Sequence, residues 1–355
     1  MNVIDKSRAS RWPALASWEG FLLLILLCVF FYGAVAVPGF LSAFNLTQAA
    51  AGMAEKALLV LPMVLLIIAR EIDLSVASIL ALCSVVLGVL IRAEVALPIA
   101  MAAALGVGAV AGAFNGWLVT ALSLPSLVVT LGTMALFRGI SYMILGTDSV
   151  NQLPDALSAF GTDNTLGNAL PWVIVPFLVL APIFAVVLQR MPLGRRIYAI
   201  GGSPDAAVYS GIPVNRLRFG MFVLSGLVCA VASVVLTARL SNARANNGLG
   251  FELDVITIAL LGGVNVFGGQ GKMTGVFLAL LLVTALRNLL GLQQIGGDAQ
   301  GVAIGALLIF SLLLNNSVGK LVGSRPHRWL ANKLAVVTGG AAELGTATKG
   351  TDRTS

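Results

Sequence analysis

Long apolar windows, interrupted only by short polar segments, recur along the whole chain. Hydrophobic residues make up 58% of its 355 residues and charged residues only 10%, whereas charged residues form about a quarter of an ordinary soluble domain. Because a membrane-spanning helix needs ~20 apolar residues, the chain is long enough to cross a bilayer many times. The pattern predicts an all-α polytopic membrane protein.

Apolar windows bounded by glycine, proline or charge give about ten predicted membrane-spanning helices. They fall near residues 20–37, 45–69, 74–92, 95–122, 126–145, 171–189, 219–240, 252–266, 272–291 and 298–318. The eighth window is short for a complete crossing, so a broken or re-entrant segment is the alternative there. The membrane domain then covers 20–318, between an N-terminal segment, 1–19, and a basic tail, 319–355. The end of that tail is expected to be disordered.

The distribution of basic residues predicts which side of the membrane each polar segment faces. With a cytoplasmic N-terminus and ten crossings, sixteen of the 22 lysines and arginines fall in cytoplasmic segments and three outside, and the other three fall within spans. This asymmetry follows the positive-inside tendency and predicts that both termini are cytoplasmic. The formal net charge of +7 is thereby explained without nucleic acid, since no basic stripe interleaves with aromatic residues.

The first window allows a second interpretation. Basic residues, an apolar run and Ala34-Val35-Ala36 also fit a cleavable signal peptide. Cleavage would leave nine spans and would move the long basic segment of the chain to the outside. We therefore prefer an uncleaved first span.

That basic segment, residues 190–218, is the one long polar stretch between apolar windows. Its arginines predict a cytoplasmic position. Ser203 is a favourable N-cap, Pro204 suits the first helical position, and Asp205 lies near the positive end of the helix dipole. Gly211 can adopt the left-handed conformation that ends a helix. A short capped helix at the cytoplasmic face of a membrane protein indicates docking.

The chain offers little for catalysis. Its single histidine, His327, lies in the basic tail, and its three cysteines lie in apolar windows without metal spacing. The glycine-rich segment 266–274 fails as a P-loop, because Val266 and Met273 stand where the motif needs a glycine and a serine or threonine. We predict that the chain is not an enzyme, holds no metal or cofactor, and depends on another chain for ATP hydrolysis.

Polar and ionisable residues within the predicted spans need partners or water. The candidate substrate-pathway residues are Glu55, Lys56, Asn115, Thr130, Thr133 and Arg138. Glu55 and Lys56 point about 100° apart on a helix, so they are not expected to pair with each other. These groups either bond within the protein or line the route of a neutral, hydroxyl-rich solute.

Glycines recur within two windows. Gly106, Gly108 and Gly112 lie in the fourth window, and Gly262 and Gly263 lie in the eighth. Small residues let membrane helices approach closely. We predict that these glycines serve mainly helix packing.

A short internal similarity suggests a repeat. The sequence EIDL at 71–74 recurs as ELDV at 252–255. Five spans separate the two copies, so they enter the membrane from opposite sides, as inverted repeats do. We hypothesise that spans 2–5 and 7–10 are related by inversion, although four similar residues also arise by chance.

Four stretches of the chain resemble the ribose-type permease subunits of bacterial ABC importers for monosaccharides. They are REIDLSVASILAL (70–82), LVVTLGTMALFRG (127–139), GRRIYAIGGSPDAAVYSGIPVNRLRF (194–219) and FELDVITIALLGGVNVFGGQGKMTG (251–275). The Trp18-Glu19 start and the AVYSGIPVNR segment are most similar to rhamnose and autoinducer-2 permeases. The chain departs from the family at Arg70 and Glu71, where two glycines are usual, and at Ala77, where a glycine is common.

The resemblance implies a type II-like ABC importer permease in the bacterial inner membrane. Its substrate would be a monosaccharide or similar small polyhydroxylated solute, and its partners an ATP-binding ATPase subunit, a periplasmic sugar-binding protein and a second permease chain, identical or different. In the family, the polar loop of the second half contacts the ATPase. That coupling loop maps onto Ser203, Pro204, Asp205, Ala206, Ala207, Tyr209 and Gly211.

Two further expectations complete the interpretation. Arg244, Glu252 and Asp254 are hypothesised to lie near the outer mouth, where the binding protein could dock. The alternative function is a secondary sugar carrier driven by an ion gradient. Such carriers use buried acids as relays, and the chain places essentially one acid, Glu55, at depth.

Overall fold

The computed structural model describes residues 18–165 and 170–309. In this part of the chain, six helices are long and apolar enough to cross a membrane, or up to seven if one bent pair counts as a single span. The prediction of a helical, polytopic membrane protein is thereby confirmed, whereas the count of ten spans is not. The predicted N-terminal segment before residue 18, the end of the tenth window and the basic tail lie outside the described residues.

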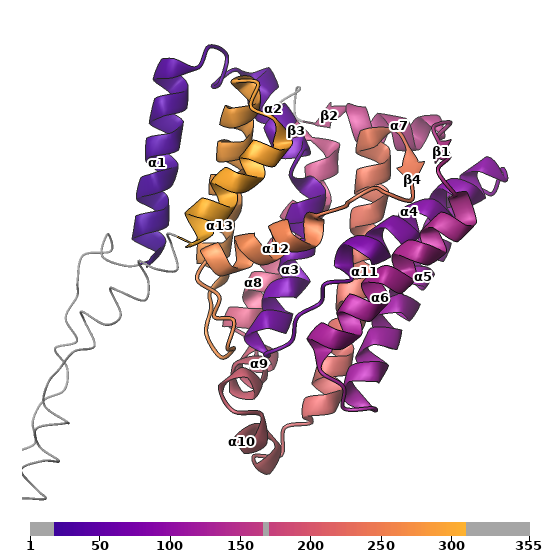
Figure 1. Cartoon of the computed structure of the whole chain (residues 1–355), viewed down its shortest axis with the longest axis vertical. Helices are drawn as coiled ribbons and strands as arrows, with labels where there is room; N and C mark the ends of the chain where they lie inside the picture. Colours follow the sequence, from indigo (N-terminus) through magenta and orange to yellow (C-terminus); the bar gives the residue numbers. More distant parts are fainter. Residues whose placement is uncertain (1–17, 166–169, 310–355) are drawn as a thin grey trace, which may run out of the picture. The chain divides into compact units, whose positions relative to one another are not determined.

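The helices follow one another along the chain with few intervening strands (Figure 1). They are α1 (Trp18–Ala36), α2 (Ala43–Ala51), α3 (Ala54–Ile68), α4 (Val76–Arg92), α5 (Leu97–Thr120), α6 (Ser126–Leu145), α7 (Asp155–Thr162), α8 (Val175–Gln189), α9 (Pro192–Gly202), α10 (Pro204–Tyr209), α11 (Val214–Leu240), α12 (Phe251–Leu261) and α13 (Met273–Leu292). A further apolar helix covers Gly297–Ile309. The strands are β1 (Ser149–Val150), β2 (Asn164–Thr165), β3 (Leu170–Pro171) and β4 (Ala243–Arg244), and a 3-10 turn, η2, covers Trp172–Ile174.

Most predicted windows coincide with helices to within a few residues, and two are notably short. The third window is α4, with 17 residues, and the eighth contains α12, with only 11. The latter favours the broken or re-entrant segment that is the alternative for the eighth window. The chain leaves α12 through Gly263, whose φ of +85° suits glycine.

The second window is broken into α2 and α3, which meet at an angle of 46°. The Ser42 hydroxyl caps α2 by accepting a hydrogen bond from the Asn45 amide at 3.3 Å. All fifteen residues of α3 are buried, which makes it a central helix of the bundle. Pro62 removes one hydrogen bond inside α3, and the neighbouring helices hold that segment in place.

Helices α5 and α11 pack along small residues. Gly108 and Gly112 lie so close to α11 that an added Cβ would overlap the backbone oxygens of Gly226 and Phe222. The packing role predicted for these two glycines is confirmed. It is wrong for Gly106, beside which there is open space.

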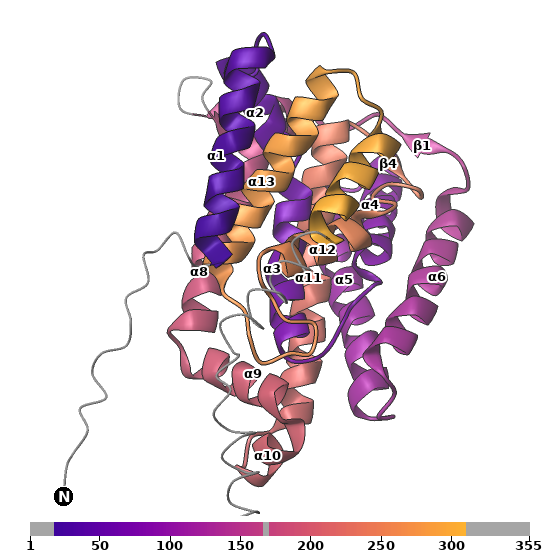
Figure 2. The same ribbon diagram turned by 60° about the vertical axis from the view of Figure 1, so that its left-hand side comes forward.

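The described part of the chain has two ends that matter for function (Figures 1 and 2). One end, here called the α10 end, contains α9, α10, the C-terminus of α3 and the loop 262–272 between α12 and α13. The opposite end contains α7 and two short antiparallel ladders. In one ladder Ser149 of β1 lies opposite Arg244 of β4, and in the other β2 pairs with β3.

Candidate functional site

The short helix α10 has the capping predicted from its sequence. The Ser203 hydroxyl accepts a hydrogen bond from the Ala206 amide at 3.3 Å, and Pro204 occupies the first helical position. The helix ends at Ser210, and Gly211 follows with a φ of +78°. The amides of Gly211 and Ile212 donate to the carbonyls of Val208 and Ala207, which is the Schellman arrangement that closes a helix.

One face of α10 is exposed although it carries large side chains. Ala207 is buried against the bundle, whereas Val208 is 57% and Tyr209 91% exposed. Asp205 is also exposed. An ordered helix that presents an aromatic ring, an aliphatic side chain and a carboxylate to its surroundings has the chemistry of a protein-docking surface.

Helix α9 leads into α10 and packs very closely on the end of α3. A Cβ on Gly201 would overlap the Ile68 carbonyl oxygen and the Gly269 amide, and the Gly269 amide itself donates to the Ile68 carbonyl at 2.8 Å. The Tyr198 hydroxyl donates to the Gly271 carbonyl at 2.6 Å. Partial burial raises the pKa of Tyr198 above its ordinary value, so this hydroxyl keeps its donor proton at neutral pH.

Arg70 fastens the same junction with its side chain. Its Nε donates to the Gly201 carbonyl at 2.7 Å and its Nη2 to the Gly202 carbonyl at 2.8 Å. These carbonyls lie at the C-terminus of α9, where the helix dipole attracts a cation. Arg70 has a φ of +66°, so this contact is made from the left-handed conformation that glycine favours.

A polar cavity of about 460 Å³ lies beside this junction, between the start of α4, the end of α5 and the starts of α6 and α11. Its walls include Glu71, Ser126 and Arg218. Arg218 Nε lies 2.8 Å from Glu71 Oε1. The pKa of the Glu71 carboxyl is raised above its ordinary value, because the effect of burial exceeds the lowering effects of a hydrogen bond with Ser126 and of the Arg218 charge.

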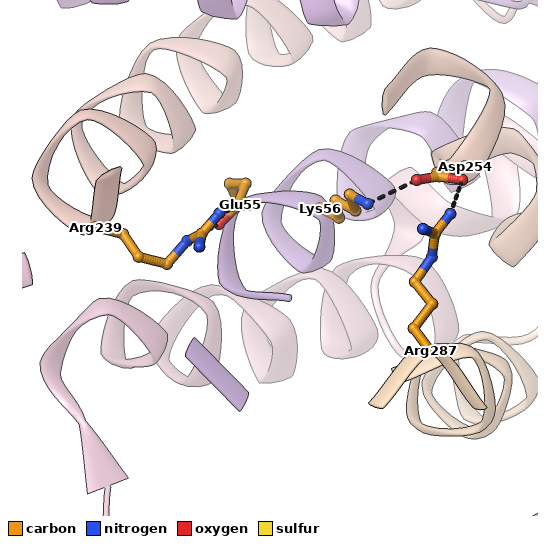
Figure 3. Close-up of polar contacts among 5 residues, drawn as sticks. All are labelled: Glu55, Lys56, Arg239, Asp254 and Arg287. Atoms are coloured by element: carbon orange, nitrogen blue, oxygen red, sulfur yellow. Dashed lines mark hydrogen bonds and ion pairs between the residues drawn. The ribbon is translucent and has the colours of Figure 1, made fainter. Parts of the chain in front are cut away.

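Five ionisable side chains lie near the opposite end of α3, as one pair and one group of three (Figure 3). The Glu55 carboxylate accepts from Arg239 Nη2 at 2.7 Å and from its Nε at 3.2 Å. The Asp254 carboxylate lies between two cations, 2.7 Å from Lys56 Nζ and 2.6 Å from Arg287 Nη2. We call this set the ion-pair end of α3.

The ion-pair end joins four helices. The Glu55–Arg239 pair links α3 to α11. Lys56 links α3 to α12 through Asp254, and the Arg287–Asp254 pair links α13 to α12. The prediction that the adjacent residues Glu55 and Lys56 do not pair with each other is confirmed. Three cations share two carboxylates here, and Lys56 also lies 4.5 Å from the centre of the Phe251 ring, which offers a favourable cation–π contact.

A second polar cluster is fully buried between α4, α5 and α11. Asn115 donates to the Ser75 hydroxyl at 2.7 Å, and that hydroxyl donates to Asp73 Oδ1 at 2.6 Å. Ser225 donates to the other oxygen of Asp73 at 3.0 Å. Asp73 and Ser75 thus form the start of α4 and tie it to its neighbours.

The other candidate pathway residues also bond within the protein. Thr130 donates to the carbonyls of Ser126 and Ile72, and the Thr133 hydroxyl lies 3.5 Å from the Thr130 carbonyl. Arg138 holds the segment after β4, because its Nη1 donates to the carbonyls of Ala245 and Asn247 at 2.7 and 2.9 Å. Their described contacts are structural, and a substrate contact remains a prediction for each.

The three residues predicted for binding-protein docking differ in their surroundings. Arg244 is exposed on β4, and Glu252 is partly buried at the start of α12. Asp254 is turned toward Lys56 and Arg287 (Figure 3). Its carboxylate therefore serves the internal ion pairs.

Sequence reasoning did not identify several of the residues that build these sites. Arg239 is one of the three basic residues that the charge pattern predicts outside, but its position near the end of α11 lets it reach Glu55. In the sequence, Arg70 stands out only as a departure from the family pattern, and nothing marks Tyr198. Among the described residues, no group of three or more histidine, cysteine, aspartate or glutamate side chains is arranged to hold a metal ion.

Comparisons with known proteins give a consistent assignment. The family model for the permease component of branched-chain amino acid transport systems matches residues 46–312. The autoinducer 2 import system permease proteins LsrD of Escherichia coli K12 and Shigella flexneri are each 34% identical to this chain over 279 residues, which cover 77% of this chain and 83% of the relative. No solved structure gives a significant match.

Proposed function

Because the chain belongs to the permease family of branched-chain amino acid transport systems, and is thus a membrane transport protein rather than an enzyme, we propose that it is the permease subunit of an ABC importer. It would form the pathway for a monosaccharide or a similar small polyhydroxylated solute. Autoinducer 2 is the favoured substrate, since relatives named for its import match most of the chain.

The observation that carries this proposal is α10. It is a capped helix of six residues that exposes Tyr209 and Val208 at one end of the bundle. An exposed aromatic ring beside an exposed aliphatic side chain on an ordered helix is typical of a protein-docking surface. A separate ATPase subunit that binds this helix would be the partner of the exposed side chains. It would also supply the ATP hydrolysis that we predict this chain lacks.

The proposed orientation follows from charge. The arginines of segment 190–218 support a cytoplasmic position for the α10 end, and both termini would then be cytoplasmic in the bacterial inner membrane. The ion-pair end would face the outer half of the bilayer. Arg244 and Glu252 would lie near the mouth that receives substrate from a periplasmic binding protein.

The mechanism is alternating access between this chain and a second permease chain, identical or different. Binding of ATP to two ATPase subunits would move α10, and the helices would switch between outward-open and inward-open arrangements. Of the buried ionisable side chains, Glu55, Lys56 and Glu71 are each paired with an opposite charge, whereas the Asp73 carboxylate accepts hydrogen bonds from Ser75 and Ser225. This suits a neutral solute, which needs hydrogen-bonding groups but no fixed counter-ion.

Transport in reconstituted vesicles tests the proposal. The chain is combined with an ATPase subunit, a second permease chain and a binding protein, and uptake of labelled autoinducer 2 is measured with ATP or with a proton gradient. We expect uptake only with ATP and all partners. Uptake by this chain alone, driven by the gradient, would instead show a secondary carrier.

A matched pair of tyrosine variants tests the docking role. Tyr209→Ala is expected to abolish ATP-driven uptake without lowering the amount of folded permease, because the side chain is almost fully exposed. Tyr32→Ala, on α1 at the opposite end, removes an equally large but less exposed ring and is expected to leave uptake intact. Equal uptake by both variants would contradict docking through α10.

A further inference from the structure

The backbone of Arg70 adopts an unfavourable left-handed conformation, whereas its side chain makes two favourable hydrogen bonds. Arg70 occupies the first position after Ala69, the C-cap of α3, where its amide donates to Ile67 and the next amide donates to Leu66. This Schellman ending requires a left-handed residue, for which glycine is the usual choice. An arginine is disfavoured there, and its two short hydrogen bonds to Gly201 and Gly202 offset that cost.

We propose that Arg70 is the positioning residue that transmits movement of α9 and α10 into α3, and through the Lys56–Asp254–Arg287 contact into α12 and α13. This inference rests on the proposed function, since the movement is the one that ATP binding would produce. The partner that binds α10 is the ATPase of the proposed function. The new element is the path by which displacement of α10 reaches the outer half of the permease.

The near end of the route is suited to transmit force. The guanidinium donates to two successive carbonyls, those of Gly201 and Gly202, at the C-terminus of α9. The residue after Gly202, Ser203, is the N-cap of α10. A planar guanidinium with two parallel donors fixes orientation as well as distance. Displacement of α10 therefore acts directly on the end of α3.

The middle of the route is α3 itself. Its fifteen residues are all buried, so neighbouring helices prevent it from bending freely at Pro62. At a rise of 1.5 Å per residue, it spans roughly 22 Å. Movement at Ile68 must then appear at Glu55 and Lys56.

The far end distributes the movement. Lys56 and Arg287 hold the same carboxylate, that of Asp254, so α3, α12 and α13 are joined there. Helix α3 is also joined to the α12–α13 loop at the α10 end, where the Gly269 amide donates to the Ile68 carbonyl. Helix α9 bonds to the same loop through Tyr198 and Gly271. Helix α3 and the α12–α13 pair are thus tied together at both ends and attached to α9 at one.

The test uses Arg70→Gly with Glu94→Gly as its matched control. Glu94 has a φ of +60° and ends α4 with the same pair of amide hydrogen bonds, to Ile91 and Leu90. Glycine relieves backbone strain equally at both positions, and only the first change removes the guanidinium. The full transporter is reconstituted, and uptake, ATP hydrolysed per molecule imported, and ATPase retained on the purified permease are measured.

We expect Arg70→Gly to reduce uptake by about tenfold, the effect of losing a charge-assisted bond that must hold during the switch. ATPase binding should be unchanged, and ATP consumed per molecule imported should rise. Arg70→Lys, which keeps the charge but not the two parallel donors, should lie between wild type and glycine. Glu94→Gly should match wild type.

Wild-type uptake and coupling in Arg70→Gly would overturn the inference while leaving the proposed function intact. Loss of ATPase binding in that variant would also overturn it, because Arg70 would then shape the docking surface. If the wild-type complex itself imports nothing with ATP, the proposed function fails. These outcomes are separable in one set of vesicles.

Discussion

The two ends of α3 are held in different ways. At the α10 end, backbone meets backbone: Gly201, Ile68 and Gly269 approach so closely that no side chain fits between them. At the ion-pair end, long side chains bridge the gaps between helices (Figure 3). A backbone junction fixes its geometry, whereas ion pairs can separate and form again. The first arrangement would transmit a movement directly, and the second would transmit it only while its ion pairs remain formed.

The largest effect should come from Gly201→Ala. The new Cβ would overlap the Ile68 carbonyl and force α9 away from α3, so we expect little folded permease in the membrane. The adjacent Gly202→Ala is the control, because nothing lies within 4 Å of its Cβ position. Equal yields of both variants in detergent extracts would show that the backbone junction is not needed.

Arg239→Met should have the next largest effect. It leaves the fully buried Glu55 carboxylate without its cation, which costs about 3–5 kcal/mol of folding stability when a buried pair is broken. The residual exposure of Arg239 places the expected value at the lower part of that range. The measurement is the thermal midpoint of the purified protein.

Two comparisons sharpen that result. Lys272→Met breaks a pair with Glu19 in which the lysine is 68% exposed, so the loss should be about 0–1 kcal/mol. Combining Arg239→Met with Glu55→Leu should recover much of the stability, because no unpaired charge remains. A double variant as unstable as the single one would mean that packing, not charge, holds this contact.

A small and local effect on stability should follow Ser203→Ala. Loss of this N-cap costs about 0.5–2 kcal/mol locally and should increase amide exchange in α10 without changing the rest of the protein. Ser210→Ala is the control, since its hydroxyl donates only to the Ala206 carbonyl in its own helix. Similar exchange in both variants would contradict the capping role.

The sequence predicted local structure better than long-range contacts. Apolar windows located most helices, and the cap chemistry of Ser203, Pro204 and Gly211 predicted α10 to within one residue, because both depend on neighbours in the chain. The break within 45–69 was missed, since its causes are weak: Gly52 and Met53 carry no strong helix-ending signal.

Pairing of charges could not be predicted in the same way. Glu55 was known to need a partner, but Arg239 lies 184 residues away, and only the packing of α3 on α11 brings the two together. The same holds for Arg70, which reaches the carbonyls of Gly201 and Gly202. A sequence gives the number of buried charges, whereas their pairing follows from helix packing.

The most direct test of the central claim asks which side of the membrane α10 faces and what covers it. Tyr209→Cys is introduced with Cys28→Ser, which removes the native cysteine that is exposed among the described residues. A membrane-impermeant maleimide is applied to intact cells and to inverted vesicles, with and without the ATPase subunit. We expect labelling of residue 209 only in inverted vesicles, and we expect the ATPase subunit to protect this residue from labelling. Labelling of residue 209 in intact cells, or no protection, would contradict this expectation.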